Sequence, residues 1–164
     1  MADLPNIARR RLQGEVIKPI YEELVAEIGP ARARALLGRA ITRSAEAEAR
    51  RAAAAEPDGE TSMERFTALF NATYRDRGLE SGLEAEVLSA GPDHLDFDVT
   101  RCRFVEVYRE LGLGEIADVL SCNRDGTFAS AYDPRITLER AQTIAEGADR
   151  CTFRYRFKPC GGGV

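Results

Sequence analysis

The sequence predicts an α+β fold: N-terminal helices, then an antiparallel sheet of about four strands with two short helices inserted between strands. Two observations lead to this class. Apolar residues recur at helical spacing in the first half of the chain, and they alternate with polar residues in later segments such as 95–99 and 151–157. The chain has 164 residues, of which 44% are hydrophobic and 30% are charged. This is ordinary globular composition and enough for one core.

Net charge and hydropathy limit the cellular locations and the classes of binding partner that we expect for the protein. The net charge of −4 argues against a nucleic-acid binder, which needs a basic face. We interpret the short basic run at residues 9–11 as solvated surface. Charged residues such as Glu15 and Lys18 interrupt the apolar runs near the N-terminus, and no apolar run approaches the ~18 residues of a membrane span. We therefore expect a cytoplasmic protein that binds neither nucleic acid nor a membrane.

Residues 1–60 are predicted to be a helical N-terminal extension that packs as one unit with an α+β, hydrolase-like domain over residues 61–160. Residues 5–28 have helical periodicity, and Pro19 within them predicts that a first helix ends or kinks just before it. Residues 31–55 are rich in Ala, Arg and Glu with only a thin apolar stripe, which predicts a largely exposed helix. Such a helix can pack on a second copy of the chain, so a homodimer is one expectation.

A further helix is predicted after a Pro-Asp-Gly break. Thr61 or Ser62 can cap its N-terminus, and Gly78 is expected to end it. Phe66, Phe70 and Tyr74 recur on one side of this helix, which we interpret as a core face.

The next two segments predict a hairpin. Residues 83–87 and 95–99 alternate in polarity on either side of a Gly-Pro-Asp turn, which predicts two strands with one buried face. If the second strand continues, Cys102 has the same parity as Asp96 and Asp98 and points away from the core.

The remaining elements complete the predicted sheet. Two short helices are expected over residues 104–111 and 116–120, the second ending beside Cys122. A third strand is predicted to start at Ile136 and to run through Thr143 and Ile144 to Glu146-Gly147. Apolar and polar residues alternate again over residues 151–157, which predicts the last strand.

The cysteines are the main candidates for chemistry. In a reducing cytosol they are thiols, metal ligands or catalysts before they are disulfides, and no Cys-x-x-Cys pair of the common zinc patterns occurs. Cys122 precedes a polar turn that ends in Asp125, where a thiol can be accessible. Arg124 can favour its thiolate, and Asp125 can donate or accept a proton. The alternative interpretation of Cys122 is a small buried residue without a chemical role.

The other three cysteines differ in their expected surroundings. Cys151 shares a strand face with aromatic residues, so by parity it belongs to the core. Cys102 lies at a strand-to-helix junction, where sites often form. Cys160 precedes a glycine tail and is expected to be an exposed thiol.

Two arginines and the sole histidine are further candidates. Arg154 and Arg156 alternate out of the core, where they either clamp a substrate carboxylate or form surface ion pairs with Glu139 or Glu146. We favour the ion pairs. His94 lies at the hairpin turn, a poor place for a buried base, so a papain-like Cys–His mechanism is not expected.

Three segments together resemble one known family. They are Cys102-Arg-Phe-Val-Glu-Val-Tyr-Arg-Glu-Leu-Gly, the Cys122-x-x-Asp125 turn, and Thr143-Ile-Ala-Glu-Gly-Ala-Asp-Arg-Cys151-Thr-Phe-Arg-Tyr. This pattern resembles the L-2-amino-thiazoline-4-carboxylic acid hydrolase family, whose members open a small heterocycle on a bacterial route from aminothiazoline carboxylate to cysteine. The resemblance covers residues 62–157, and residues 1–60 carry nothing recognisable of it.

The resemblance implies a hydrolase that opens a small ring at a C–N or C–S bond through a cysteine-based site, without a cofactor. The family pattern maps onto Cys102, Cys122, Asp125, Asp149 and Cys151. We expect catalytic roles for the three cysteines and Asp125, and substrate-binding roles for Asp149 and for the strand arginines Arg154 and Arg156.

The implied chemistry fits these residue types, with two alternatives left open. A thiolate at Cys122 can add to the electrophilic ring carbon, Asp125 can protonate the leaving group and then activate water, and one of the two arginines can hold the carboxylate. Alternatively, Cys102, Cys122, Asp125 and Cys151 ligate a zinc ion that activates water. The third possibility is a non-enzymatic module that senses a small molecule or a metal ion.

Overall fold

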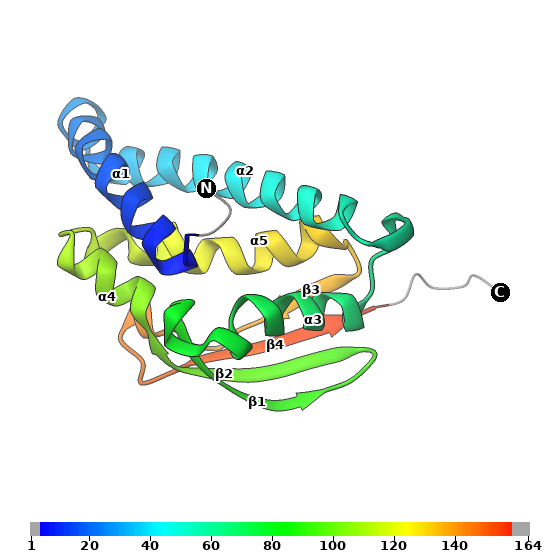
Figure 1. Ribbon diagram of the computed structural model, residues 1–164. Helices are drawn as coiled ribbons and strands as arrows, with labels where there is room; N and C mark the ends of the chain where they lie inside the picture. The colour runs from blue at the N-terminus through cyan, green and yellow to red at the C-terminus, as the bar shows by residue number, and fades with distance from the viewer. Residues whose placement is uncertain (1–3, 159–164) are drawn as a thin grey trace.

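The computed structural model describes residues 4–158, which form one four-stranded sheet beneath a stack of helices (Figure 1). The helices are α1 (Asn6–Ile28), α2 (Pro30–Ala54), α3 (Met63–Thr73), α4 (Arg103–Glu110) and α5 (Asn123–Tyr132). The strands are β1 (Leu83–Ala90), β2 (His94–Cys102), β3 (Ile136–Glu139) and β4 (Cys151–Phe157). They pair antiparallel throughout, in the order β1-β2-β4-β3, which confirms the predicted α+β class.

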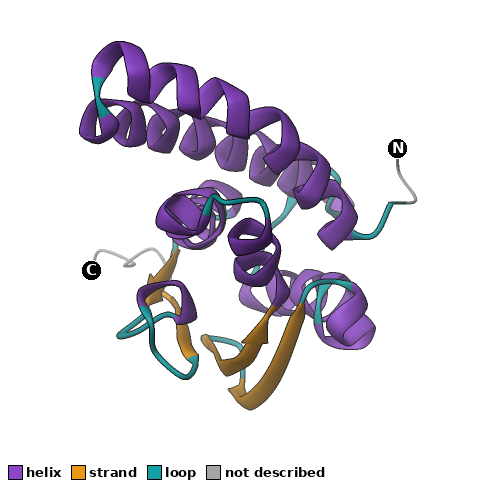
Figure 2. Cartoon of the chain, turned by 90° about the vertical axis from the view of Figure 1, so that its left-hand side faces the viewer, coloured by secondary structure: helices purple, strands orange, loops and turns teal. Residues whose placement is uncertain are grey.

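Helices cover one face of the sheet in two layers (Figures 1 and 2). Helices α3 and α5 lie next to the sheet, and α2 packs across the far side of α5 with α1 beside it. The hydrophobic core between sheet and helices includes Tyr21 from α1 and Leu37 from α2. The N-terminal helices therefore share one core with the rest of the described chain.

Helix α1 runs through Pro19, so the predicted end of a first helix at this point is wrong. Proline has no backbone N–H, and the carbonyl of Glu15 loses its usual helical partner. Pro19 lies on the exposed side of α1, where water can bind that carbonyl. Gly29, with φ of 79°, then turns the chain, and α2 confirms the helix predicted over residues 31–55.

The start of α3 is capped as predicted, but its end lies earlier. The Ser62 side chain accepts a hydrogen bond from the backbone N–H of Arg65 at 3.2 Å. The α-helix ends at Thr73. Gly78 lies in the following 3₁₀ turn, η2 (Arg75–Glu80), with φ of 51°.

A β-bulge in β2 turns Cys102 into the core, so the predicted polar parity of this residue is wrong. The register with β1 shifts by one residue between Val99 and Arg101, and Thr100 is the extra residue. One extra residue reverses the alternation of side chains beyond it. Cys102 is accordingly buried in the same core as Val99.

Residues 114–132 form a continuous helical segment instead of a helix that ends in a polar turn after Cys122. A 3₁₀ turn, η3 (Gly114–Ile116), leads into a π-helical turn, η4 (Asp118–Cys122), and α5 follows directly. The predicted turn is therefore wrong, because its residues form the first turn of α5. Isolated π turns occur often at functional sites. Here the turn ends at Cys122, and Asp125 follows one helical turn later.

The predicted hairpin, first short helix and last strand are confirmed as β1–β2, α4 and β4. Strand β3 is shorter than predicted, because Thr143 caps a separate 3₁₀ turn, η5 (Ile144–Glu146). Cys160, predicted to be an exposed thiol, lies outside the described residues. None of the helices within residues 4–158 combines the length and the apolar character needed to cross a bilayer.

Candidate functional site

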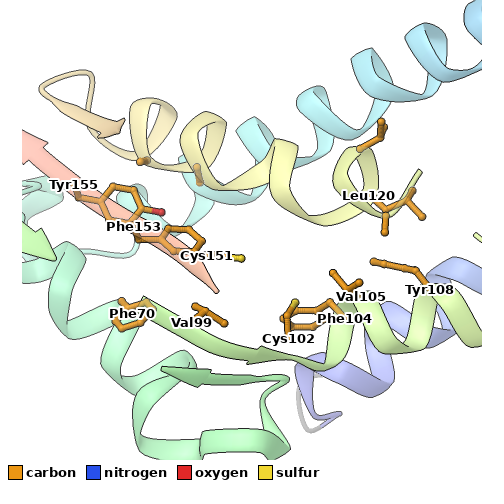
Figure 3. Packing of buried hydrophobic residues seen from close by; sticks show 14 of the residues in the cluster. Phe70, Val99, Cys102, Phe104, Val105, Tyr108, Leu120, Cys151, Phe153 and Tyr155 are labelled. Atoms are coloured by element: carbon orange, nitrogen blue, oxygen red, sulfur yellow. The ribbon is translucent and has the colours of Figure 1, made fainter. Parts of the chain in front are cut away.

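A cavity of about 410 Å³ lies between the inner face of the sheet and the helices. Aromatic rings form much of its wall: Phe97 of β2 stacks on Phe70 of α3 and on Phe153 of β4, with centroids 4.2 and 4.6 Å apart. Figure 3 shows Phe70, Phe153 and Tyr155 grouped at one end of this interior space. A cavity of this size with apolar walls can enclose a small ring compound.

Three thiols reach the cavity from different elements. Cys102 ends β2, Cys151 begins β4, and Cys122 ends η4. Figure 3 shows the side chains of Cys102 and Cys151 on neighbouring strands, both directed into the interior, so Cys151 lies in the core as predicted. Burial raises the pKa of Cys102 and of Cys122 to about 12, and it raises that of Cys151 too. All three are neutral thiols at pH 7, so a nucleophilic role needs a base.

Asp125 supplies a carboxylate beside Cys122, and Arg140 holds both residues. One guanidinium nitrogen of Arg140 donates to Asp125 Oδ2 at 2.6 Å, and the other donates to the backbone oxygen of Cys122 at 2.9 Å. Burial raises the pKa of Asp125, and the charge of Arg140 opposes this shift. A carboxylate with a raised pKa is suited to accept a proton from a neighbouring thiol.

Arg140 is the cation next to Cys122, and the sequence did not indicate this residue. The charge of Arg140 lowers the pKa of the Cys122 thiol, against the larger effects of burial and of Asp125. Arg124, predicted to play this part, instead pairs with Glu48. The guanidinium of Arg140 also lies over the ring of Phe153, 5.1 Å from its centroid, within the roughly 6 Å limit of a cation–π contact.

Two arginines and one glutamate form a charged cluster in the cavity wall. Glu48 of α2 pairs with Arg124 of α5 and, at 3.6 Å, with Arg10 of α1. Arg10 and Arg124 are only 9% and 8% exposed, so the interpretation of Arg10 as solvated surface is wrong. Burial lowers the pKa of Arg124, and the nearby charge of Arg10 lowers it further. Two guanidinium groups against one carboxylate leave an excess positive charge that can bind an anionic group.

Arg154 and Arg156 lie on the opposite face of the sheet, and neither lines the cavity. Arg154 pairs with Asp98 at 3.0 Å, and Arg156 pairs with Asp96 on the same neighbouring strand. Both arginines thus form ion pairs, as we favoured, but with aspartates of β2 in place of the glutamates that we expected. Neither arginine therefore shares the cavity with Cys122.

Two further candidates also lie away from the cavity. Asp149 is exposed and pairs with Arg150 at 3.7 Å. His94 at the hairpin contacts Ser89 Oγ through Nε2 at 2.8 Å and Asp93 Oδ1 through Nδ1 at 2.7 Å. This Ser–His–Asp chain lies on an exposed turn, and none of its members lines the cavity.

The zinc alternative lacks a matching geometry. It required Cys102, Cys122, Cys151 and Asp125 to converge on a single ion. Residues 4–158 contain no group of three or more His, Cys, Asp or Glu side chains arranged to hold a metal ion.

The sequence profile of the family described as L-2-amino-thiazoline-4-carboxylic acid hydrolase matches residues 9–155. The chain belongs to this family. The match begins within α1, so the expectation that residues 1–60 carry none of the family pattern is wrong. Arg10 and Glu48, which help to line the cavity, both fall in the matched range.

A similar solved structure is the phenol-responsive sensory domain of the transcription activator PoxR, with phenol. The two chains are 16% identical, with a TM-score of 0.53 over 90% of this chain and 74% of that one. At this level of identity the likeness establishes a common fold and leaves function to the site. No curated protein matches the chain.

Proposed function

We propose that this family member is a cytoplasmic hydrolase that opens the ring of a small heterocyclic carboxylate, such as L-2-aminothiazoline-4-carboxylate, with Cys122 as the nucleophile. One observation carries the proposal. Cys122 and Asp125 line the same apolar cavity, and Arg140 binds both of them. The family match supports the reaction class.

The first half of the reaction breaks the ring. The Cys122 thiol attacks the ring carbon that lies between nitrogen and sulfur, which is electrophilic because it is amidine-like. Asp125 takes the thiol proton as the Sγ–C bond forms, since the resting thiol is neutral. The ring C–N or C–S bond then breaks, and Asp125 passes the proton to the departing heteroatom.

The second half releases the product. Water attacks the carbon now bound to Cys122, Asp125 accepts a proton from the water, and the Sγ–C bond breaks as Sγ regains a proton. The sum of both halves consumes one water molecule. We assign Cys102 and Cys151 to the wall beside the reacting carbon, where buried neutral thiols keep the cavity apolar.

The substrate carboxylate is assigned to Arg10 and Arg124 instead of Arg154 and Arg156. The first two line the cavity and share one ion-pair partner, Glu48, whereas the second two are paired on the far face of the sheet. A carboxylate bound there would neutralise the excess charge of the cluster and fix the ring in the cavity.

The test is a mass-spectrometric turnover assay with L-2-aminothiazoline-4-carboxylate and chelator-treated protein. A product one water heavier than the substrate, formed only with protein present, is the expected result. Substrate that stays unchanged, although a binding assay shows it in the cavity, would exclude the hydrolase and leave a protein that only binds.

Replacing Arg124 by methionine is expected to raise KM by about 10- to 100-fold, the cost of one charge-assisted hydrogen bond, with a much smaller change in kcat. Methionine is uncharged and keeps the unbranched apolar stem of the side chain, while Arg10 can still pair with Glu48. A second readout is the preference for the carboxylate over 2-aminothiazoline as a competing ligand, which the variant should lose.

Arg154→Met is the matched control for this prediction, since it removes the same charge from the outer face of the sheet. Its KM should equal that of the unmodified protein. A raised KM in Arg154→Met together with a normal KM in Arg124→Met would return the carboxylate to the outer face.

The aromatic wall favours one second candidate function, a binding module for a small aromatic molecule. Phe70, Phe97 and Phe153 form a continuous stack beside the cavity, and the PoxR domain of similar fold is described with phenol. Calorimetry with phenol would distinguish this function, because the ligand would bind and be recovered unchanged.

A further inference from the structure

The outer side of α1 carries a row of exposed apolar side chains. Leu12, Val16 and Ile20 are 51%, 63% and 53% exposed, and they follow one another at four-residue spacing. Residues four apart lie on the same side of a helix, so the three form one stripe. The opposite side of α1 is buried through Arg10 and Tyr21. An apolar stripe on the free side of a packed helix indicates a partner that covers it.

The charges at either end of the stripe indicate what that partner is. Arg9 lies seven residues before Val16, and Glu23 lies seven residues after it, so both continue the same stripe. If two α1 helices pair antiparallel about Val16, Leu12 of each copy faces Ile20 of the other. Arg9 then faces Glu23 at both ends. Within residues 4–158 neither Arg9 nor Glu23 forms an ion pair of its own.

We propose that the protein forms a two-fold homodimer in which the α1 helices of two copies pair antiparallel through Leu12, Val16 and Ile20. A two-fold axis requires a self-complementary surface, and this stripe, with its charges reversed about its centre, is one. A membrane surface fits less well, because Glu15 and Glu23 would face the anionic head groups. Helix α1 has 23 residues and lies at the edge of the helical layer (Figure 1).

The interface is assigned to α1 and not to residues 31–55, where the sequence placed the exposed helix. Much of α2 is covered by α5 and α1. One helix pair is a small contact, and we expect dissociation in the micromolar range.

The test is sedimentation velocity of the full chain at about 1 to 300 µM, a range that brackets such a weak dimer. The unmodified protein should move from monomer to dimer as concentration rises. Val16→Glu should stay monomeric, because two like charges would meet on the axis, and should keep its thermal unfolding temperature, because Val16 is exposed. Leu88→Glu is the matched control: Leu88 is 52% exposed on β1, far from α1 in sequence, and this variant should still dimerise.

Exchanging the charges of Arg9 and Glu23 tests whether the two α1 helices pair antiparallel. Arg9→Glu and Glu23→Arg should each weaken the dimer at least about tenfold, since each places like charges together, and the double variant should restore it. A monomer at every concentration, or a dimer insensitive to Val16→Glu, would overturn the homodimer. A double variant that stays as weak as the single ones would overturn the antiparallel register.

Discussion

Replacing Cys122 by serine is expected to lower kcat/KM for L-2-aminothiazoline-4-carboxylate by at least about 1,000-fold. Serine is nearly the same size, but its hydroxyl is a weaker acid and a weaker nucleophile than the thiol. The loss should therefore appear in kcat more than in KM, because the groups proposed to bind the substrate are the aromatic wall and the pair Arg10 and Arg124. Intact-protein mass spectrometry of acid-quenched samples should show a covalent adduct in the unmodified protein and none in Cys122→Ser.

A second buried thiol of the same cavity provides the comparison. The Cys151 sulfur accepts a hydrogen bond from the backbone N–H of Ile144 at 3.2 Å, which a serine hydroxyl can also accept. Cys151→Ser should therefore lose less than about tenfold in kcat/KM, the scale of one modest hydrogen-bond change. If Cys122→Ser kept more than about a tenth of the turnover while Cys151→Ser lost it, Cys151 would be the nucleophile.

Local patterns were sufficient to predict much of the fold. The alternation in β2 and β4 predicted two strands with one buried face, and Ser62 marked the start of α3. These features depend on neighbouring residues only. Binary pattern and capping therefore predicted them without knowledge of the tertiary fold.

The wrong predictions come from features that only tertiary contacts decide. The Asn-Arg-Asp-Gly run has the composition of a turn, yet it begins α5, because Asn123 binds Gly38 and Thr42 of α2 and Arg124 pairs with Glu48. The bulge at Thr100, which turns Cys102 into the core, likewise leaves no mark in a period-two pattern.

The candidate site likewise combines residues that a local sequence pattern can predict with residues that only the tertiary fold brings together. Cys122 and Asp125 lie three positions apart in the sequence, so a short motif was sufficient to identify them as candidates. Arg140 reaches them from the loop after β3, and Arg10 joins the cavity wall from α1. No local pattern relates an arginine in α1 to a thiol more than a hundred positions later. Arg154, by contrast, was prominent in the sequence as a regular strand position, and the fold turns it away from the cavity.

The second large effect concerns proton transfer at Asp125. Asp125→Asn should lower kcat by about 100- to 10,000-fold, the usual contribution of a general acid–base. Asparagine keeps the shape and can still accept the hydrogen bond from Arg140, so the cavity should stay intact. The unmodified protein needs the ionised carboxylate in its free form, so kcat/KM should rise with pH through the pKa of Asp125. Since burial raises that pKa, the midpoint should lie above the ordinary 3.8 of an aspartate.

The charge of Arg140 determines the direction in which the pH midpoint of kcat/KM should move. Its charge lowers the pKa of Asp125, so Arg140→Met should move the midpoint to still higher pH, and part of the lost activity should return in alkaline solution. Arg140→Lys keeps the charge and should shift the midpoint less. The measurement is kcat/KM from pH 4 to pH 9, with circular dichroism at each pH to establish that the fold persists. An unmoved midpoint in Arg140→Met, or an acid limb that survives in Asp125→Asn, would assign the titrating base to another residue. Burial raises the pKa of Asp125 and the positive charge of Arg140 lowers it, so removing that charge alone should leave burial to raise the pKa further. The pH midpoint of kcat/KM then reports the protonation state of the carboxylate that must accept the Cys122 proton.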